Sequence, residues 1–324
     1  MVPPPTFCPA CRKKRRLCFK NDWNYYPNSC KKCGKNVVSI YSPNTERVVY
    51  CPSCWWGDSW NPLSYGRDFD FTKTFTEQFV ELLKVVPRAA MLNSESENCE
   101  YTQFAANNKN CYMLVQSSHN EEVYYSYWSQ KCKDSIDTSF MLGSELCYDS
   151  VGLENCYRTR YSATSSGCVD SYFLMNCDAC TNCFGCVNLR NKKYCVFNEQ
   201  KTQAEYEQYI QSMRLDTWEG VERARQQYRV FLLTQPMKYA GVHSIENCTG
   251  DWLHRAKNCF RVFDGYDIEE VRYGEHILRN VKDCMDSDCV ARDCELVYEG
   301  VQNVINIYNC KFCFVARQGS SNLE

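Results

Sequence analysis

Three CxxC pairs within the first 54 residues constrain the fold of this chain more than any other feature; they are Cys8/Cys11, Cys30/Cys33 and Cys51/Cys54. A segment this short cannot bury enough apolar surface to fold unaided. Two such pairs, each presenting two thiolates from a tight turn, supply the four soft ligands of a closed tetrahedral zinc site. The pairs therefore predict a small module at the N-terminus whose fold depends on a bound metal.

The second and third pairs are separated by 17 residues that favour β-structure. Residues 37–41 and 47–50 are typical of strands, and Ser42-Pro43-Asn44 is typical of a turn. We therefore predict a zinc ribbon over residues 1–60, with one site formed by Cys30, Cys33, Cys51 and Cys54. Pairing Cys8/Cys11 with Cys30/Cys33 is an alternative, but it leaves Cys51/Cys54 alone. In the favoured arrangement Cys8 and Cys11 form a second, incomplete site.

The chain contains 25 cysteines in 324 residues, which raises the question of disulfides. The odd count, the chain length and the CxxC pairs favour reduced thiols with bound metal over a secreted disulfide scaffold. No run of 18 apolar residues and no signal peptide is visible. These features predict a cytoplasmic protein without a membrane-spanning segment.

Charge is distributed unevenly along the chain. Residues 1–54 carry a net charge of +8, and the remainder carries −10. Cations beside aromatic side chains suit contacts with phosphates and stacked bases. The candidate nucleic-acid-binding residues are Arg12, Lys13, Lys14, Arg15, Arg16 and Trp23. The alternative interpretation is a solvated basic loop with aromatic residues packed beneath the ribbon.

Two segments have helical patterns. Residues 61–96 are expected to form a linker followed by an amphipathic helix that starts at Thr74 or Thr76 and stops at Pro87. Residues 199–240 are expected to form a helical insertion, because Thr202 and Glu205 make a capping box. A further helix is expected to begin at Thr217. The apolar stripes of these helices predict core-facing packing rather than partner sites.

Between these segments, cysteines and small residues recur at short, regular intervals. Cys99, Cys111 and Cys147 are separated from one another by exact multiples of twelve residues. Cys156 begins a series of cysteines separated by nine or twelve residues. Small residues that recur in this way, flanked by Tyr, Phe and Val, are typical of a β-solenoid. We therefore predict a parallel β-helix over residues 97–198, with cysteine ladders in its interior. The predicted fold class is thus mainly β.

The solenoid pattern returns near the C-terminus. Glu97-Asn98-Cys99 matches Glu246-Asn247-Cys248, and Lys109-Asn110-Cys111 matches Lys257-Asn258-Cys259. Further matches join residues 121–123 to 269–271, residues 133–137 to 282–286, and residues 145–148 to 295–298. Residues 241–318 are therefore expected to form a second solenoid part, which is an internal duplication of residues 97–157.

The densest cysteine run is formed by Cys177, Cys180, Cys183 and Cys186. Its spacing approximates an iron–sulfur ligand pattern, but it lacks the three-residue last gap and the following proline. Because the run also follows the solenoid period, interior packing is the favoured interpretation. A bound metal or iron–sulfur cluster is the alternative.

Sequence signatures of common enzymes are missing from this chain. There is no GxxxxGK[ST], GxSxG, HExxH or GxGxxG motif, and the four histidines are scattered singly. A solenoid can carry sugar-cleaving chemistry, but such enzymes are normally exported. The sequence therefore favours a non-enzymatic role.

Several motifs together resemble an uncharacterised family of cysteine-rich zinc-ribbon proteins found mainly in candidate-phylum bacteria. They are VPPPTFCPACRKKRRL, SCKKCGKNVVSIYSPN, VYCPSCWWGDSWNPLSYGRDFDF, FTEQFVELLKVVPR and NCFGCVNLRNKKYCVFN. The resemblance implies another CxxC pair before the VPPPT segment, which would complete a first zinc site with Cys8 and Cys11. It implies no activity.

The sequence thus predicts a zinc-binding scaffold or binding protein that holds one or two zinc ions. The basic ribbon would contact nucleic acid or a ribonucleoprotein, and the solenoid would present a surface for a protein partner. The alternative function is a metal-handling or redox protein with an iron–sulfur or multi-thiolate centre, and a carbohydrate-active β-helix enzyme is a more distant candidate.

Overall fold

The computed structural model describes residues 7–18, 21–265, 271–278, 288–291, 295, 301, 303–304, 306 and 308–309. The chain forms two compact units, and each is described by itself. One unit is Asp22–Gln235, and the other joins Met1–Asn21 to Pro236–Glu324. The division falls inside the predicted helical insertion 199–240. The finer five-part division stays a prediction.

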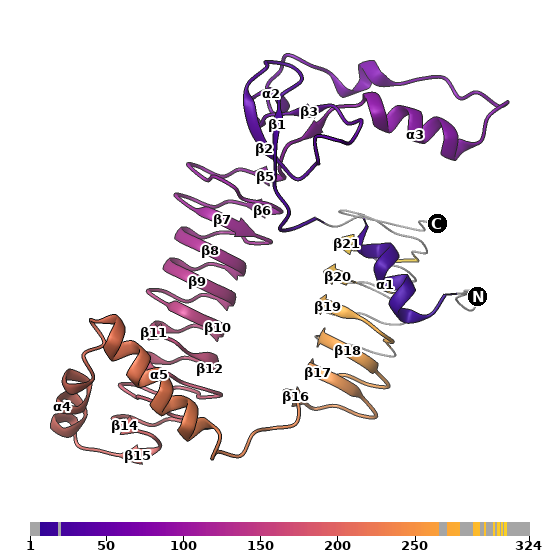
Figure 1. Ribbon diagram of the computed structural model, residues 1–324. Helices are drawn as coiled ribbons and strands as arrows, with labels where there is room; N and C mark the ends of the chain where they lie inside the picture. The colour runs from indigo at the N-terminus through magenta and orange to yellow at the C-terminus, as the bar shows by residue number, and fades with distance from the viewer. Residues whose placement is uncertain are drawn as a thin grey trace. The chain divides into compact units, whose positions relative to one another are not determined.

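The first unit begins with a small module of short elements that leads into helix α3 (Figure 1). Strands β1 and β2 pair antiparallel, and β3 pairs in parallel with β4. The bounds of the elements are β1 Tyr26–Ser29, β2 Asn36–Ser39, β3 Val49–Tyr50, α2 Pro52–Trp55, the 3₁₀ helix η1 Pro62–Tyr65, α3 Phe75–Val85 and β4 Arg88–Ala89.

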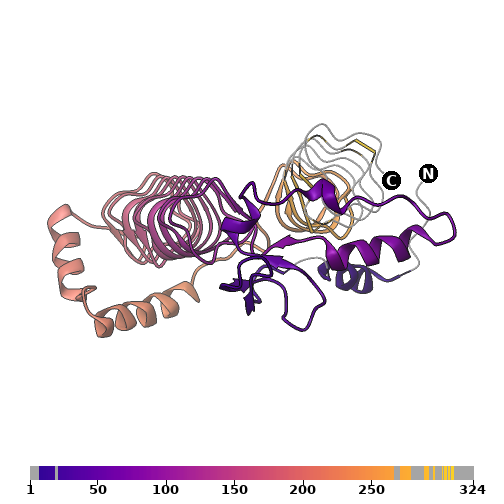
Figure 2. The same ribbon diagram turned by 90° about the horizontal axis from the view of Figure 1, so that it is seen from above.

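Residues 93–198 follow as a pile of short parallel strands, which we call the twelve-residue stack. Its partners are offset by twelve residues, as in Tyr124 with Ile136 and Tyr148 with Ile136. Figure 2 shows its successive turns superposed when seen from above. The strands are β5 Asn93–Ser94, β6 Ala105–Ala106, β7 Tyr112–Val115, β8 Glu121–Gln130, β9 Lys133–Leu142, β10 Tyr148–Glu154, β11 Tyr157–Arg160, β12 Ala163–Ser166 and β13 Val169–Tyr172.

A three-residue rhythm underlies the period of twelve. Every third residue from Glu95 to Phe197 has a positive φ, so the chain bends at regular intervals. The residue that follows a bend generally points inward, as Leu114, Ser117 and Asn120 do, and all three are buried. Lys192, which follows the bend at Asn191 near the end of the stack, is exposed. One layer of the stack, meaning twelve successive residues, therefore has four sides and four inward positions.

Most inward positions are filled by Ser, Thr, Asn or Cys, whose side chains hydrogen-bond to backbone groups, and apolar residues such as Leu114 fill others. The amide of Cys147 donates to Oγ of Ser135 at 3.1 Å, and that hydroxyl donates to the carbonyl of Lys133 at 2.8 Å. The thiol of Cys147 donates to the carbonyl of Glu145 at 3.4 Å and accepts the amide of Thr159. Serine and cysteine thus satisfy the same inward-pointing amides, which would otherwise be buried without a partner.

Two helices pack on one side of the last layers of the stack. Helix α4 (Gln203–Met213) starts at the predicted Thr202–Glu205 capping box, and α5 (Trp218–Leu232) starts after Thr217. Their buried residues, including Met213 and Tyr228, join a core with aromatic side chains of the stack. The prediction that these helices face the core is confirmed. A short antiparallel pair precedes them, formed by β14 Cys195–Val196 and β15 Glu199–Gln200.

The second unit contains α1 and a six-stranded parallel sheet in the order β16-β17-β18-β19-β20-β21. The pairing of Phe263 with Glu275 keeps the offset of twelve, whereas Thr249 with Phe260 has an offset of eleven beside a bulge. Matched residues 269–270, 282–286 and 296–298 lie outside the described residues. The bounds are α1 Pro9–Leu17, β16 Val242–His243, β17 Thr249–His254, β18 Phe260–Gly265, β19 Glu275–Leu278, β20 Asp288–Ala291 and β21 Asn303–Val304.

The described part of the molecule is therefore mainly β, as predicted, with parallel sheets in both units. No helix among the described residues is long and apolar enough to cross a membrane.

Candidate metal centre

Local structure brings the second and third CxxC pairs together. Cys30 and Cys33 lie in the turn of the β1–β2 hairpin, where the amide of Cys30 donates to the carbonyl of Lys35 at 2.8 Å. Cys51 caps the N-terminus of α2, whose first residue is a proline, and Cys54 lies within that helix. A proline suits this first helical position, because the amide it lacks would have no partner within the helix.

One detail of the predicted ribbon is wrong. The sequence predicted a hairpin between residues 37–41 and residues 47–50. In the structure β2 pairs instead with β1, and β3 pairs with β4, which lies beyond α3. The hairpin therefore encloses the Cys30/Cys33 pair rather than joining the two pairs. Tyr26–Ser29 has an interior proline, which disfavours a strand, so this partner was not recognised.

The four sulfur atoms of Cys30, Cys33, Cys51 and Cys54 all lie within 4.8 Å of one another. The sulfurs of Cys33 and Cys51 are 3.8 Å apart. Zinc–sulfur bonds of about 2.3 Å in a tetrahedron place two sulfurs roughly 3.8 Å apart, so this spacing fits a tetrathiolate zinc site. No other group of three or more His, Cys, Asp or Glu ligand atoms gathers in this way within the described ranges.

Hydrogen bonds from backbone amides favour the thiolate form of Cys30, which is the form that binds a cation. Burial raises the pKa of Cys30, but the amides of Cys51, Cys33 and Lys32 outweigh it and lower this pKa to about 6. The Cys51 amide lies 3.3 Å from the Cys30 sulfur. Burial and the neighbouring sulfurs raise the pKa of Cys54 to about 12. Four crowded thiols cannot all ionise without a positive charge among them, and a divalent cation supplies that charge.

Aromatic rings pack around Cys30, Cys51 and Cys54, whereas Cys33 is exposed. Trp60 packs against Trp55 with ring centroids 4.9 Å apart and against Tyr50 at 5.5 Å. The indole of Trp60 donates to the carbonyl of Trp55 at 2.8 Å, which fixes the ring. Cys30 is only 1% exposed. These rings limit solvent access to Cys30 and Cys51, the two buried ligands.

The first CxxC pair has a different setting. Cys8 precedes α1 and Cys11 lies in its first turn, and both are exposed. No third ligand atom joins them among the residues that the structure describes. A second, incomplete metal site at Cys8 and Cys11 therefore stays a prediction.

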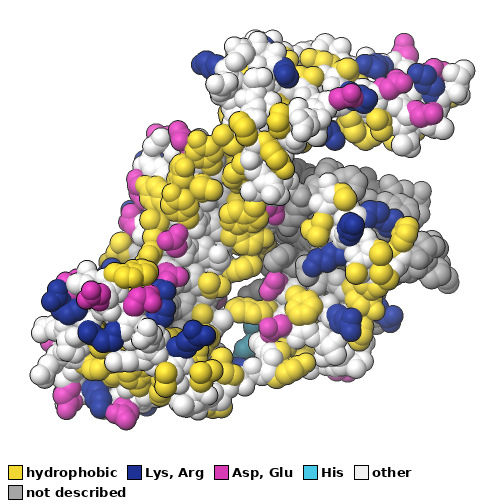
Figure 3. Space-filling view, in the orientation of Figure 1, with side chains coloured by type: hydrophobic (Ala, Val, Ile, Leu, Met, Phe, Trp, Pro, Cys, Tyr) yellow, Lys and Arg dark blue, Asp and Glu magenta, His cyan; other side chains and the backbone are white. Residues whose placement is uncertain are grey.

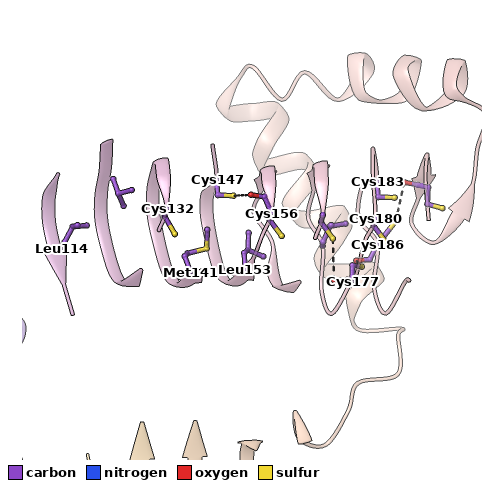
Figure 4. Close-up of a cluster of buried hydrophobic side chains, with 14 of the residues drawn as sticks. Leu114, Cys132, Met141, Cys147, Leu153, Cys156, Cys177, Cys180, Cys183 and Cys186 are labelled. Carbon is purple, nitrogen blue, oxygen red and sulfur yellow. Dashed lines mark hydrogen bonds between the residues drawn. The ribbon is translucent and has the colours of Figure 1, made fainter. Parts of the chain in front are cut away.

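The four cysteines of the run 177–186 occupy the four inward positions of one layer, and all are buried (Figure 4). Their thiols donate to nearby carbonyls, as Cys177 does to Met175 at 3.5 Å. No three of the four sulfurs lie within 4.8 Å of one another in this fully described segment. The hydrogen bonds support the packing interpretation, and a cluster at these residues stays a prediction.

The predicted nucleic-acid-binding residues are divided between the two units. Lys13, Lys14 and Arg15 lie on α1 with Arg12 and Arg16, and the last two are buried. Arg12 lies over the ring of Tyr273 at 5.9 Å. Trp23 belongs to the other unit, where it packs against Tyr127 at 5.6 Å. The basic loop of the alternative interpretation is a helix in the structure, and two of its five cations are turned inward.

These observations define a mainly β chain with a four-cysteine centre of the kind that holds zinc. No family model matches it. A segment of 56 residues is 36% identical to the LIM domain-containing protein C of Dictyostelium discoideum, and it covers 16% of this chain and 31% of that protein. The chain thus spans about a third of the length of this relative.

Proposed function

We propose that this chain is a zinc-stabilised β-solenoid protein that acts as a scaffold rather than as an enzyme. The observation that carries the proposal is the convergence of four cysteine sulfurs within 4.8 Å. The similarity to a LIM domain-containing protein supports it, because LIM domains are cysteine-rich modules with structural zinc. The twelve-residue offset between parallel strands supports the solenoid assignment.

In this proposal Cys30, Cys33, Cys51 and Cys54 hold one zinc ion in a closed site. A closed site has no open position for water or substrate, so zinc there stabilises a fold. Cys8 and Cys11 would bind a second ion only with ligands from outside the described residues. The cysteine-rich family suggested by the motifs is consistent with this assignment.

Elemental analysis of the purified full chain tests the zinc assignment. We expect about one zinc ion per chain at the closed site. Cys33→Ser should abolish this zinc, because it removes one of four ligands. Cys99→Ser is the matched control, since Cys99 lies in the stack outside the cluster. Zinc-free wild-type protein after reconstitution, or equal loss in both variants, would refute the site.

The same measurement tests the alternative metal-handling function. An iron–sulfur cluster at Cys177, Cys180, Cys183 and Cys186 would give brown protein with iron after anaerobic purification. Cys180→Ser would remove that iron and leave the zinc in place. Colourless protein with zinc alone would eliminate the cluster and leave the hydrogen-bonding role of these thiols.

We also propose that the exposed cations of α1 contact a polyanionic partner such as RNA or DNA. Lys14 and Arg15 are exposed on α1, whereas Arg12 and Arg16 are buried. Few exposed cations can neutralise few phosphates, so RNA or DNA binding would be weak and would fall gently with salt. Lys14→Glu with Arg15→Glu should abolish such binding in a titration at low salt. Undetectable binding of RNA and DNA by the wild type would refute the proposed polyanionic partner.

A further inference from the structure

Aromatic side chains form a column along one outward side of the twelve-residue stack. Successive rings lie 4.8–5.7 Å apart in each half of the column. Ile136 fills the gap between the two halves, because it pairs with both Tyr124 and Tyr148. The rings of this aromatic column are Tyr101, Tyr112, Tyr125, Tyr148, Tyr161, Phe173, Phe184 and Phe197.

The second half of the aromatic column is covered by a helix of the same chain. Tyr228 of α5 packs against Phe173 at 5.6 Å, and Phe231 packs against Phe197 at 5.1 Å. At the edge of this cover Arg225 lies over Tyr161 at 5.7 Å and pairs with Asp149 at 2.8 Å. The column is therefore a surface that accepts the apolar face of an amphipathic helix.

No helix covers the first half of the column within its own unit. Tyr125 is 51% exposed there, and Ile136 is 36% exposed. Figure 3, in the orientation of Figure 1, shows apolar side chains gathered over β7 to β9, next to the face that α5 covers. An apolar surface that continues directly from a packed interface is typical of an interaction site.

Helix α3 has an apolar face that is covered only near its C-terminal end, where Leu82 and Leu83 are half-buried. None of its residues is buried, which contradicts the prediction that it faces the core. Phe75 and Phe79 are 66% and 45% exposed, and their rings stack on one side of the helix at 5.5 Å. Amphipathic helices normally bury this face.

The two unpaired surfaces have matching lengths. The 11 residues of α3 span about 16 Å at 1.5 Å per residue. The open half of the column, from Tyr101 to Ile136, covers three layer steps, or about 14 Å at 4.8 Å per step. The covered half from Asp149 to Phe197 spans four steps, about 19 Å, beneath a helix of 15 residues.

The chain's own α3 is held elsewhere. Just past its C-terminus, Arg88–Ala89 pairs with β3 of the metal-site module. Lys84 pairs with Glu46 of the same module at 2.6 Å. Both connections tie α3 to the metal-site module. A second copy of the chain provides the open column without disturbing them.

We propose that α3 of one copy docks on the open half of the aromatic column of another copy, as α5 docks on the second half. In a closed dimer, each copy would place its α3 on the column of the other. If the column of the first copy were instead filled by a third copy, the contacts would build an open chain of copies. The rings of the column and those of α3 would supply the buried aromatic anchors that dominate such interfaces. The occupant is thus a second copy of this chain.

The experiment measures the mass of the full chain by sedimentation over a range of concentrations. We expect the wild type to exceed the single-chain mass of 37.9 kDa. Phe79→Ser on α3 and Tyr125→Ser on the column should each weaken association roughly tenfold or more. Tyr157→Ser is the matched control, because Tyr157 is an exposed tyrosine outside the column. It should leave the mass unchanged.

Mixing the two interface variants identifies which surfaces meet. The Phe79→Ser copy keeps an intact column, and the Tyr125→Ser copy keeps an intact α3. An equimolar mixture should therefore regain association that neither variant shows alone. Association through two α3 helices would instead survive Tyr125→Ser and would not be restored by mixing. A wild type that stays at single-chain mass, or either of these last results, overturns the proposal.

Discussion

In the N-terminal module four cysteine sulfurs converge within 4.8 Å of one another. In the twelve-residue stack, by contrast, the inward sulfurs make hydrogen bonds with backbone groups. The thiol of Cys156 donates to the carbonyl of Glu154 at 3.5 Å, and the thiol of Cys147 accepts the amide of Thr159. The first arrangement leaves negative charge without a counter-charge, whereas the second satisfies neutral thiols with backbone groups.

The pKa shifts are mixed in both arrangements. Neighbouring thiols that share protons lower the pKa of Cys156 and Cys186 in the stack, just as burial and neighbouring sulfurs raise that of Cys54 in the module. Three amides around Cys30 overcome its burial and lower its pKa to about 6. Burial raises the pKa of Cys147 to about 12, and neighbouring thiols add to this rise. The direction of the pKa shift alone therefore does not separate the two groups of cysteines. Convergence of the sulfurs, rather than their number, separates a metal ligand from an interior packing residue.

The largest expected effect is the loss of metal from the module. Structural zinc sites of this kind contribute on the order of 10 kcal/mol of binding free energy, which is also folding free energy. Removing zinc with a chelator should therefore unfold residues 26–60 and leave residues 93–198 folded. Hydrogen exchange measured along the chain would show this as lost protection in the module alone.

Cys51→Ser should reproduce the effect of the chelator, and Cys186→Ser is its control. Both residues are buried cysteines, but only the first belongs to the converging group. Equal loss of protection in the module and in the stack after chelation would contradict the comparison, because it would mean that metal also holds the stack.

Much of this contrast could be predicted from residue spacing. The CxxC pairs at Cys30 and Cys51 identified the converging group, and the twelve-residue spacing of Cys99 and Cys111 identified a ladder. The nine-residue steps, such as Cys168 to Cys177, now have a geometric reason. Each is one layer forward and one side back, because a side has three residues. The three-residue rhythm itself was hidden, since Ser, Thr, Asn and Cys all occupy inward positions.

Other features could not be derived from local patterns. The apolar stripe of α3 resembles those of α4 and α5, yet only the latter two helices contain fully buried residues. A stripe shows that a helix has an apolar face but does not show what lies opposite it. The burial of Arg12 and Arg16 could not be predicted from the sequence either, because the aliphatic part of a cationic side chain can pack along an apolar surface.

A smaller effect tests the hydrogen-bonding role of the stack thiols. Cys147→Ala should leave the inward amide of Thr159 without an acceptor, at a cost of about 1–3 kcal/mol. Cys147→Ser keeps an acceptor at the γ-position, as Ser135 does one layer earlier, and should cost less than about 1 kcal/mol. Urea unfolding of the full chain compares the two variants.

The reverse exchange at the neighbouring layer completes this test. Ser135→Cys should be tolerated better than Ser135→Ala, because the amide of Cys147 donates to the γ-atom at this position. If alanine and the hydrogen-bonding residue were equally stable at both positions, interior volume alone would decide these sites, and the two groups of cysteines would differ less than we infer.

The smallest effect is a dependence on alkaline pH. A thiol in the unfolded chain has a pKa near 9, and burial raises that of Cys147 to about 12 in the folded stack. Below pH 9 the thiol is protonated in both states, so its contribution to stability is fully present. Between pH 9 and 12 the unfolded chain releases a proton that the folded chain retains, and the contribution is progressively lost. The urea midpoint of the wild type should therefore fall from pH 8 to pH 10.5.

Other groups, above all lysines and tyrosines, also titrate in this range, so the difference between two proteins is the informative quantity. Cys147→Ser lacks the ionisable thiol and should lose less stability than the wild type over the same interval. Cys30 has the opposite sign, because its lowered pKa makes its contribution greatest at high pH and lost as the pH falls toward 6. Parallel pH profiles for the wild type and Cys147→Ser would show that burial does not hold this stack thiol neutral.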